Sequence, residues 1–162
     1  MIGEKMLKAL NEQLNAEYFS SYLYLAMAAY FESENLPGFA HWMRLQSQEE
    51  LGHAMKFFDH ILDRGGQVTL QPIAAPPSEW ASPLAAFEAA YQHEQMISGR
   101  IHDLANLAIA EGDHASNIFL HWFVTEQVEE EKNANEVVQI LKKIRDSAGG
   151  LYQLDHRLGH RT

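Results

Sequence analysis

Large apolar residues recur every three or four positions over most of the chain, a spacing that places them on one face of an α-helix. Leu7, Leu10 and Leu14 begin the first such stripe. The stripes predict long amphipathic helices over about residues 3–33, 37–64, 82–111 and 113–145, and a short helix over about 149–159. Glycine, proline and aspartate separate the stripes, and these residues end or restart helices. We therefore expect an all-α protein.

The one long connection, residues 67–81, has no helical period and contains three of the five prolines. Fully extended it reaches on the order of 50 Å, whereas a helix of about 28 residues is roughly 42 Å long. It can therefore run the length of a bundle, which makes the second and third helices parallel. A disordered linker is the alternative. Packing is favoured because Val68, Leu70, Ile73 and Trp80 are apolar.

Polar residues interrupt each apolar stripe near the middle of its helix. The interruptions are Glu17 in the first helix, Glu50 and His53 in the second, Glu94 in the third, and Gln127 and Glu130 in the fourth. The midpoints of similar helices lie at one height in a bundle, whichever way each helix points. A single Glu-x-x-His pair is more often a surface pair or a coincidence than a metal site. One interruption per helix instead predicts a buried polar cluster.

The chemistry of this cluster favours a metal. A buried ionised carboxylate needs a partner, a proton or a cation, and Glu-x-x-His on an inward helix face is the spacing of di-iron carboxylate bundles. Oxygen ligands with one imidazole suit Fe(II) or Mn(II) better than Cu(I). Four carboxylates provide enough charge for two ions, with Glu50 as the expected bridge. Tyr24 lies seven residues beyond Glu17 on the same face, within reach of a ligand.

Composition narrows the class of protein further. The 162 residues fit one domain over 1–162, and no 18-residue uncharged apolar run predicts a membrane span. The absence of cysteine excludes disulfides and thiolate sites. The formal charge of −10 makes nucleic acid a poor partner. Residues 1–5 lead into a charged amphipathic helix rather than a signal core, which favours the cytoplasm.

Several segments resemble the non-haem bacterial ferritins, over nearly the whole chain. They are residues 10–13 leading into Glu17, then 49–53, 122–131 and 151–155. The resemblance implies a ferritin-like four-helix bundle with a long crossover and a short fifth helix. It also implies iron storage in a hollow shell of 24 subunits, with the short helix as a fourfold contact. Fe(II) would be oxidised there by O2, or by H2O2, before storage.

The resemblance also implies roles for individual residues. Glu17, Glu50, His53 and Glu94 would ligate the two irons, Gln127 would lie beside the second iron, and Glu130 would lie between that iron and a third site. The third site would comprise Glu49, Glu126, Glu129 and Glu130. Tyr24 and Trp122 match aromatic residues near the centre, which are discussed in the family as electron donors.

The chain departs from related families at specific positions. Haem-binding relatives carry a second Glu-x-x-His on the fourth helix and a methionine after the bridging glutamate. This chain has Gln127-x-x-Glu130 and Leu51, so no haem is expected. Asn117 and Leu120 stand where many animal ferritins place threefold-pore carboxylates, which leaves the iron route undefined.

Two alternative functions remain open at this point. One is a di-iron oxidase or peroxidase resembling the rubrerythrins, which the lack of cysteine disfavours because it removes the rubredoxin donor. The other is a non-catalytic helical assembly or metal buffer with a degraded centre.

Overall fold

The computed structural model describes residues 1–162 as five helices without a strand. The helices are α1 (Glu4–Ser33), α2 (Pro37–Asp63), α3 (Pro83–Ala110), α4 (His114–Ile144) and α5 (Ala148–Leu158). Every end lies within one residue of the position expected from the apolar stripes. The predicted all-α architecture is confirmed. No helix carries an apolar stretch long enough to cross a bilayer.

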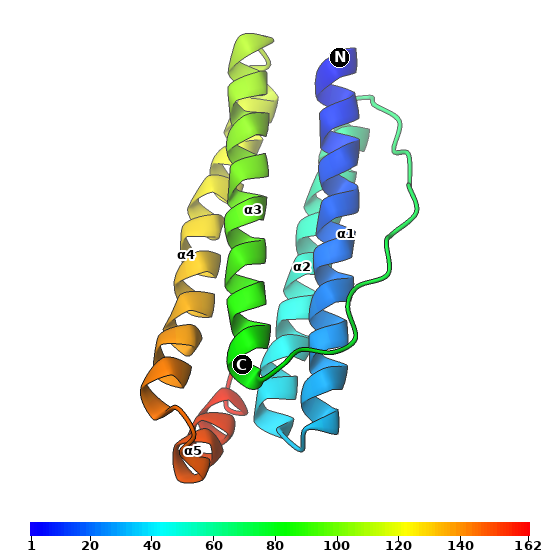
Figure 1. Ribbon diagram of the computed structural model, residues 1–162. Helices are drawn as coiled ribbons and strands as arrows, with labels where there is room; N and C mark the ends of the chain where they lie inside the picture. Colours follow the sequence, from blue (N-terminus) through cyan, green and yellow to red (C-terminus); the bar gives the residue numbers. More distant parts are fainter.

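The four long helices lie side by side, and α1 packs against α2 while α3 packs against α4 (Figure 1). The crossover runs down the outside of α1 from the end of α2 to the start of α3, so α2 and α3 point the same way. This confirms the long crossover expected from the length of the proline-containing stretch. The short helix α5 lies across one end of the bundle, beside α2.

The crossover is held to α1 by one asparagine. The side chain of Asn11 accepts a hydrogen bond from the Thr69 backbone N–H (2.7 Å) and donates one to the Gln67 carbonyl (3.0 Å). Val68 and Trp80 pack against the core as expected. Leu70 and Ile73 do not, since they are 67% and 42% exposed. The prediction that these two residues pack is wrong for the isolated chain, because the segment leaves the bundle between its anchors.

The first turn of α2 is capped from a distant part of the chain. Its own N-cap residue, Leu36, has no side chain that can accept from the free N–H groups. The carboxylate of Asp155 in α5 instead accepts from the N–H groups of Gly38 (2.8 Å) and Phe39 (3.0 Å). A Cβ atom on Gly38 would lie only 1.7 Å from the Asp155 carbonyl oxygen. Glycine is therefore what allows α5 to dock here.

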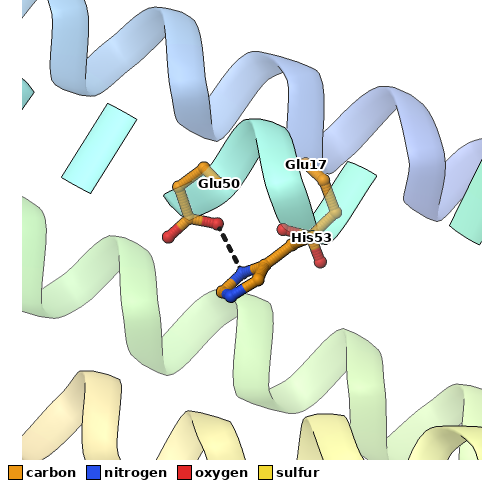
Figure 2. A group of neighbouring side chains, drawn as sticks. All are labelled: Glu17, Glu50 and His53. Atoms are coloured by element: carbon orange, nitrogen blue, oxygen red, sulfur yellow. Dashed lines mark hydrogen bonds and ion pairs between the residues drawn. The ribbon is translucent and has the colours of Figure 1, made fainter. Parts of the chain in front are cut away.

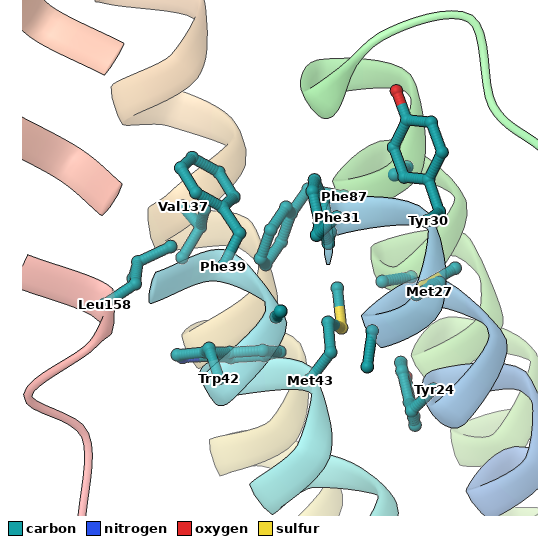
Figure 3. Packing of buried hydrophobic residues seen from close by; sticks show 14 of the residues in the cluster. Tyr24, Met27, Tyr30, Phe31, Phe39, Trp42, Met43, Phe87, Val137 and Leu158 are labelled. Atoms are coloured by element: carbon teal, nitrogen blue, oxygen red, sulfur yellow. The ribbon is translucent and has the colours of Figure 1, made fainter. Parts of the chain in front are cut away.

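The hydrophobic core is divided into two clusters at opposite ends of the bundle. One cluster surrounds Phe31, Phe39 and Phe87, whose ring centroids lie 5.0–5.8 Å apart, and Leu158 of α5 reaches it (Figure 3). The other surrounds Phe57 and Phe123, 4.4 Å apart. Between them, at mid-height, lies a layer of buried polar side chains.

Candidate metal centre

The six polar residues that interrupt the apolar stripes meet in this middle layer. Each is at most 4% exposed, and they come from all four long helices: Glu17 from α1, Glu50 and His53 from α2, Glu94 from α3, and Gln127 and Glu130 from α4. The helical period places each on the inward face. The similar helix lengths place them all at one height.

The ligand atoms of these residues form two overlapping groups, each with all atoms within 4.8 Å of one another. One group is Glu17, Glu50 and His53, and the other is Glu50, Glu94 and Glu130. Figure 2 shows the first group, in which Nδ1 of His53 lies 3.1 Å from Oε2 of Glu50. Glu50 belongs to both groups, so it occupies the position that a bridging carboxylate would need.

Buried amides orient the carboxylates. Gln13 donates to Glu17 (2.8 Å), and Gln46 donates to both Glu50 (3.1 Å) and Glu130 (2.6 Å). Sequence reasoning did not assign a role to either glutamine. Each precedes its carboxylate by four residues, and Gln46 lies on the same stripe as Glu50. That i, i+4 spacing on a core face is the signal that could have found them.

The α3–α4 side of the layer is held in the same way. Gln127 donates to the Glu94 carboxylate (3.1 Å) and lies 3.3 Å from the Ser98 hydroxyl. The hydroxyl of Tyr24, which reaches across from α1, donates to the other oxygen of Glu94. Gln127 and Tyr24 therefore both contact a candidate ligand.

One atom in the layer has no partner. Oε2 of Glu17 is the only buried side-chain nitrogen or oxygen atom without a hydrogen bond. A carboxylate oxygen buried without a donor costs free energy unless it is protonated or faces a cation. This oxygen belongs to the group that also contains Glu50 and His53. The residues present therefore fit a cation.

The electrostatics of the layer also indicate that it can hold a cation. Burial, reinforced by the charge of Glu50, raises the pKa of Glu17. Burial and then the charges of Glu94 and Glu130 raise the pKa of Glu50. The pKa of Glu130 rises to about 8, because of burial and then the charge of Glu94. Without a cation, Glu130 is protonated at neutral pH, and burial favours the protonated forms of Glu17 and Glu50. A divalent metal can replace such protons.

The residues expected at a third site are only partly brought together. Glu126 joins His53 and Glu130 in a third possible ligand group, with its Oε1 3.9 Å from Nε2 of His53. Glu49 lies outside every such group, and its carboxylate accepts from Arg161 (2.9 Å). Glu129 is exposed and also lies outside them.

Trp122, which matches an aromatic residue near the centre of the ferritins, is 40% exposed. Its indole ring meets the His53 ring edge to face, with centroids 5.5 Å apart, and the Lys56 ammonium lies 4.0 Å from its centroid. It therefore forms the outer wall of the site beside His53.

The chain is similar to ferritins in both sequence and structure. A family model described as a ferritin-like domain matches residues 7–144. The bacterial non-heme ferritin of Bacteroides fragilis is 46% identical over 99% of this chain and 100% of its own length. That of Staphylococcus aureus is 37% identical over 100% of this chain and 98% of its own length. The open pore ferritin of the archaeon Archaeoglobus fulgidus superposes with a TM-score of 0.99 at 52% identity, over 100% of both chains.

Proposed function

The chain belongs to the ferritin-like family, which stores iron, and on this premise we propose that its polar layer is an intrasubunit ferroxidase centre. The observation that carries the proposal is the carboxylate of Glu50. It is shared by two groups of possible ligands, one of which contains the unpartnered oxygen of Glu17. One Fe(II) would be held by Glu17, Glu50 and His53. The other would be held by Glu50, Glu94 and Glu130, with Gln127 beside it.

The proposed reaction uses iron as the substrate. Two Fe(II) ions each give one electron to O2, and with two protons the products are two Fe(III) ions and one H2O2. Paired metals about 3.5–4 Å apart are suited to a substrate that bridges them. Glu17, Glu50, Glu94 and Glu130, when ionised, neutralise the charge of two Fe(II). Their negative charge also favours the ferric product electrostatically.

The surrounding residues keep the ligands in place. In the proposed centre, Tyr24 fixes Glu94 through its hydroxyl, and Gln127 fixes the other oxygen of the same carboxylate. The apolar clusters on both sides exclude bulk water from the layer. No haem is proposed, because position 51 is leucine and the fourth helix lacks a second Glu-x-x-His.

We propose that Fe(III) leaves through Glu130 and Glu126. Glu130 is shared between the second ion group and the group with His53 and Glu126, and Glu126 is only half-buried. Glu49 and Glu129 are exposed and lie outside that group. They would complete the third iron site after side-chain movement.

The product would accumulate inside a homo-oligomeric cage of 24 subunits. Large apolar side chains that a monomer leaves exposed support association, among them Tyr22 (50%), Leu25 (51%) and Ile109 (66%). Size-exclusion chromatography tests this part of the proposal. A free monomer or dimer would contradict it.

The site assignment is tested by stopped-flow oxidation of Fe(II) in air. Glu17→Ala, Glu50→Ala and His53→Ala are each expected to slow the fast phase by about 100-fold, because a lost ligand misplaces the iron. Glu88→Gln serves as the control, since Glu88 is an accessible carboxylate of α3 paired with Lys142. Unchanged fast kinetics in the three ligand variants would refute the assignment. Normal assembly without oxygen consumption by the wild type would instead favour a non-catalytic metal buffer.

A further inference from the structure

Arg161, the penultimate residue, is bound along α2 by its whole side chain, which is only 17% exposed. Its guanidinium donates to the Trp42 carbonyl (3.0 Å), the Gln46 amide oxygen (3.0 Å) and the Glu49 carboxylate (2.9 Å). It also stacks on the Trp42 ring, 4.4 Å from the centroid. The Arg161 carbonyl in turn is 2.7 Å from Nε2 of His41. The end of the chain therefore has one defined position on α2.

The contact with Gln46 determines how that amide is oriented. A guanidinium has donors only, whereas a glutamine amide has one acceptor oxygen and one donor NH2 group. With its oxygen held by Arg161, Gln46 must present its NH2 to the opposite side, where it donates to Glu50 and Glu130. With Arg161 in place Gln46 is only 1% exposed, so the arginine takes the place that solvent would otherwise have beside the amide oxygen.

The same arrangement occurs independently on the α1 side of the centre. Arg100 donates to the amide oxygen of Gln13 (2.8 Å), and Gln13 donates to Glu17 (2.8 Å). In each case an arginine outside the polar layer fixes a buried glutamine, which then fixes candidate ligand carboxylates. Because the arrangement occurs twice, each arginine is best explained as a residue that orients a glutamine amide.

We propose that Arg161 is a positioning residue of the metal centre, which holds Glu50 and Glu130 in ligand geometry through the Gln46 amide. The inference rests on the proposed function and extends it to the C-terminal segment after α5. The inference predicts that loss of Arg161 changes the affinity for a cation in the direction opposite to that expected from charge alone. Removing a nearby positive charge would strengthen cation binding, whereas releasing Gln46 weakens it.

Anaerobic Co(II) titration of the full-length, metal-free protein tests this inference, with the d–d absorption bands and calorimetry as readouts. Arg161→Met keeps the packing over Trp42 but removes every donor. It is expected to weaken Co(II) binding by about 10- to 100-fold, the usual effect of losing a group that orients a ligand. Gln46→Leu should weaken it similarly. The double variant should be no weaker than Gln46→Leu, because the arginine acts through the glutamine.

Arg44→Gln is the matched control, since Arg44 is an accessible arginine of α2 that pairs only with Glu32; its affinity should equal that of the wild type. Should Arg161→Met fail to assemble, Arg161→Lys replaces it. This variant is expected to weaken Co(II) binding less than Arg161→Met would, and to have no effect when Gln46 is also replaced by leucine. Unchanged or tighter binding without Arg161, or additive losses in the double variant, would overturn the inference. A wild type that binds no Co(II) would instead refute the centre itself.

Discussion

Glu130 is the residue at which the electrostatics of the centre are most directly measurable. Burial and the charge of Glu94 raise its pKa to about 8, whereas an unfolded glutamate titrates near about 4.3. The folded, metal-free protein thus binds a proton here that the unfolded chain releases. The stability that this proton contributes is complete below the unfolded pKa and is lost as pH rises towards 8.

Glu130→Gln should therefore stabilise the metal-free protein increasingly between pH 5 and pH 8. The expected gain at pH 8 is on the order of 1 to 4 kcal/mol, from about 1.4 kcal/mol per pH unit. Denaturation at several pH values measures the difference. The comparison must be between variant and wild type, because His93, whose pKa burial lowers to about 4, contributes a trend of opposite sign at acid pH. A difference that does not depend on pH would contradict the prediction.

At the residue scale, sequence periodicity located the candidate ligands and Tyr24 beside them, but not the arginines that contact the buried glutamines. Glu17, Glu50 and Glu94 were identifiable because a carboxylate on an apolar stripe has to be buried. Gln46 lies on the same stripe, but nothing local indicates that Arg161, 115 positions away, fixes it. The contact between the Trp122 and His53 rings likewise depends on the packing angle between α2 and α4, which residue spacing does not define.

At the scale of elements, the docking of α5 on α2 depends on the absence of a side chain at Gly38. Gly38→Ala forces a Cβ into the Asp155 carbonyl oxygen, a clash of 1.7 Å with backbone that cannot rotate away. We expect a loss of about 1 to 3 kcal/mol, typical of overpacking, together with faster proteolysis of residues 148–162. Denaturation and limited proteolysis measure the two effects.

Gly52→Ala in the same helix is the control for that substitution. A Cβ added to Gly52 would meet no other atom within 4 Å, and alanine in a helix interior is favoured over glycine by roughly 0.5–1 kcal/mol. This variant should therefore be slightly more stable than the wild type. If Gly38→Ala behaved like Gly52→Ala, the docking of α5 would not depend on close contact at this turn.

Helix number, helix ends and the parallel course of α2 and α3 followed from local signals, because glycine and proline end helices wherever they stand in a fold. The path of the crossover could not be predicted from such local signals. Leu70 and Ile73 were expected to pack because they are apolar, yet they remain 67% and 42% exposed in the single chain. The cap that Asp155 provides for α2 could not be predicted from local sequence either, since Asp155 and Gly38 are 117 residues apart.

At the scale of the whole molecule, the polar layer divides the core and leaves each half with its own hydrophobic cluster. Four buried carboxyl groups at this boundary weaken the metal-free bundle by their desolvation. A cation bound only by the folded protein reverses that effect. The gain is about 2.7 kcal/mol for each site when the free metal is at 100 times its dissociation constant.

Zn(II) added to the metal-free protein should therefore raise the melting temperature in a concentration-dependent way. Because the Glu130 carboxyl group, whose pKa is about 8, is protonated in the metal-free protein at neutral pH, metal binding should also release a proton and weaken as pH falls. Calorimetry in buffers of different ionisation enthalpy counts the protons released. Glu50→Ala removes the carboxylate shared by both ligand groups, so it should abolish most of the thermal shift. An equal shift in this variant would mean that Zn(II) stabilises the fold from outside the polar layer.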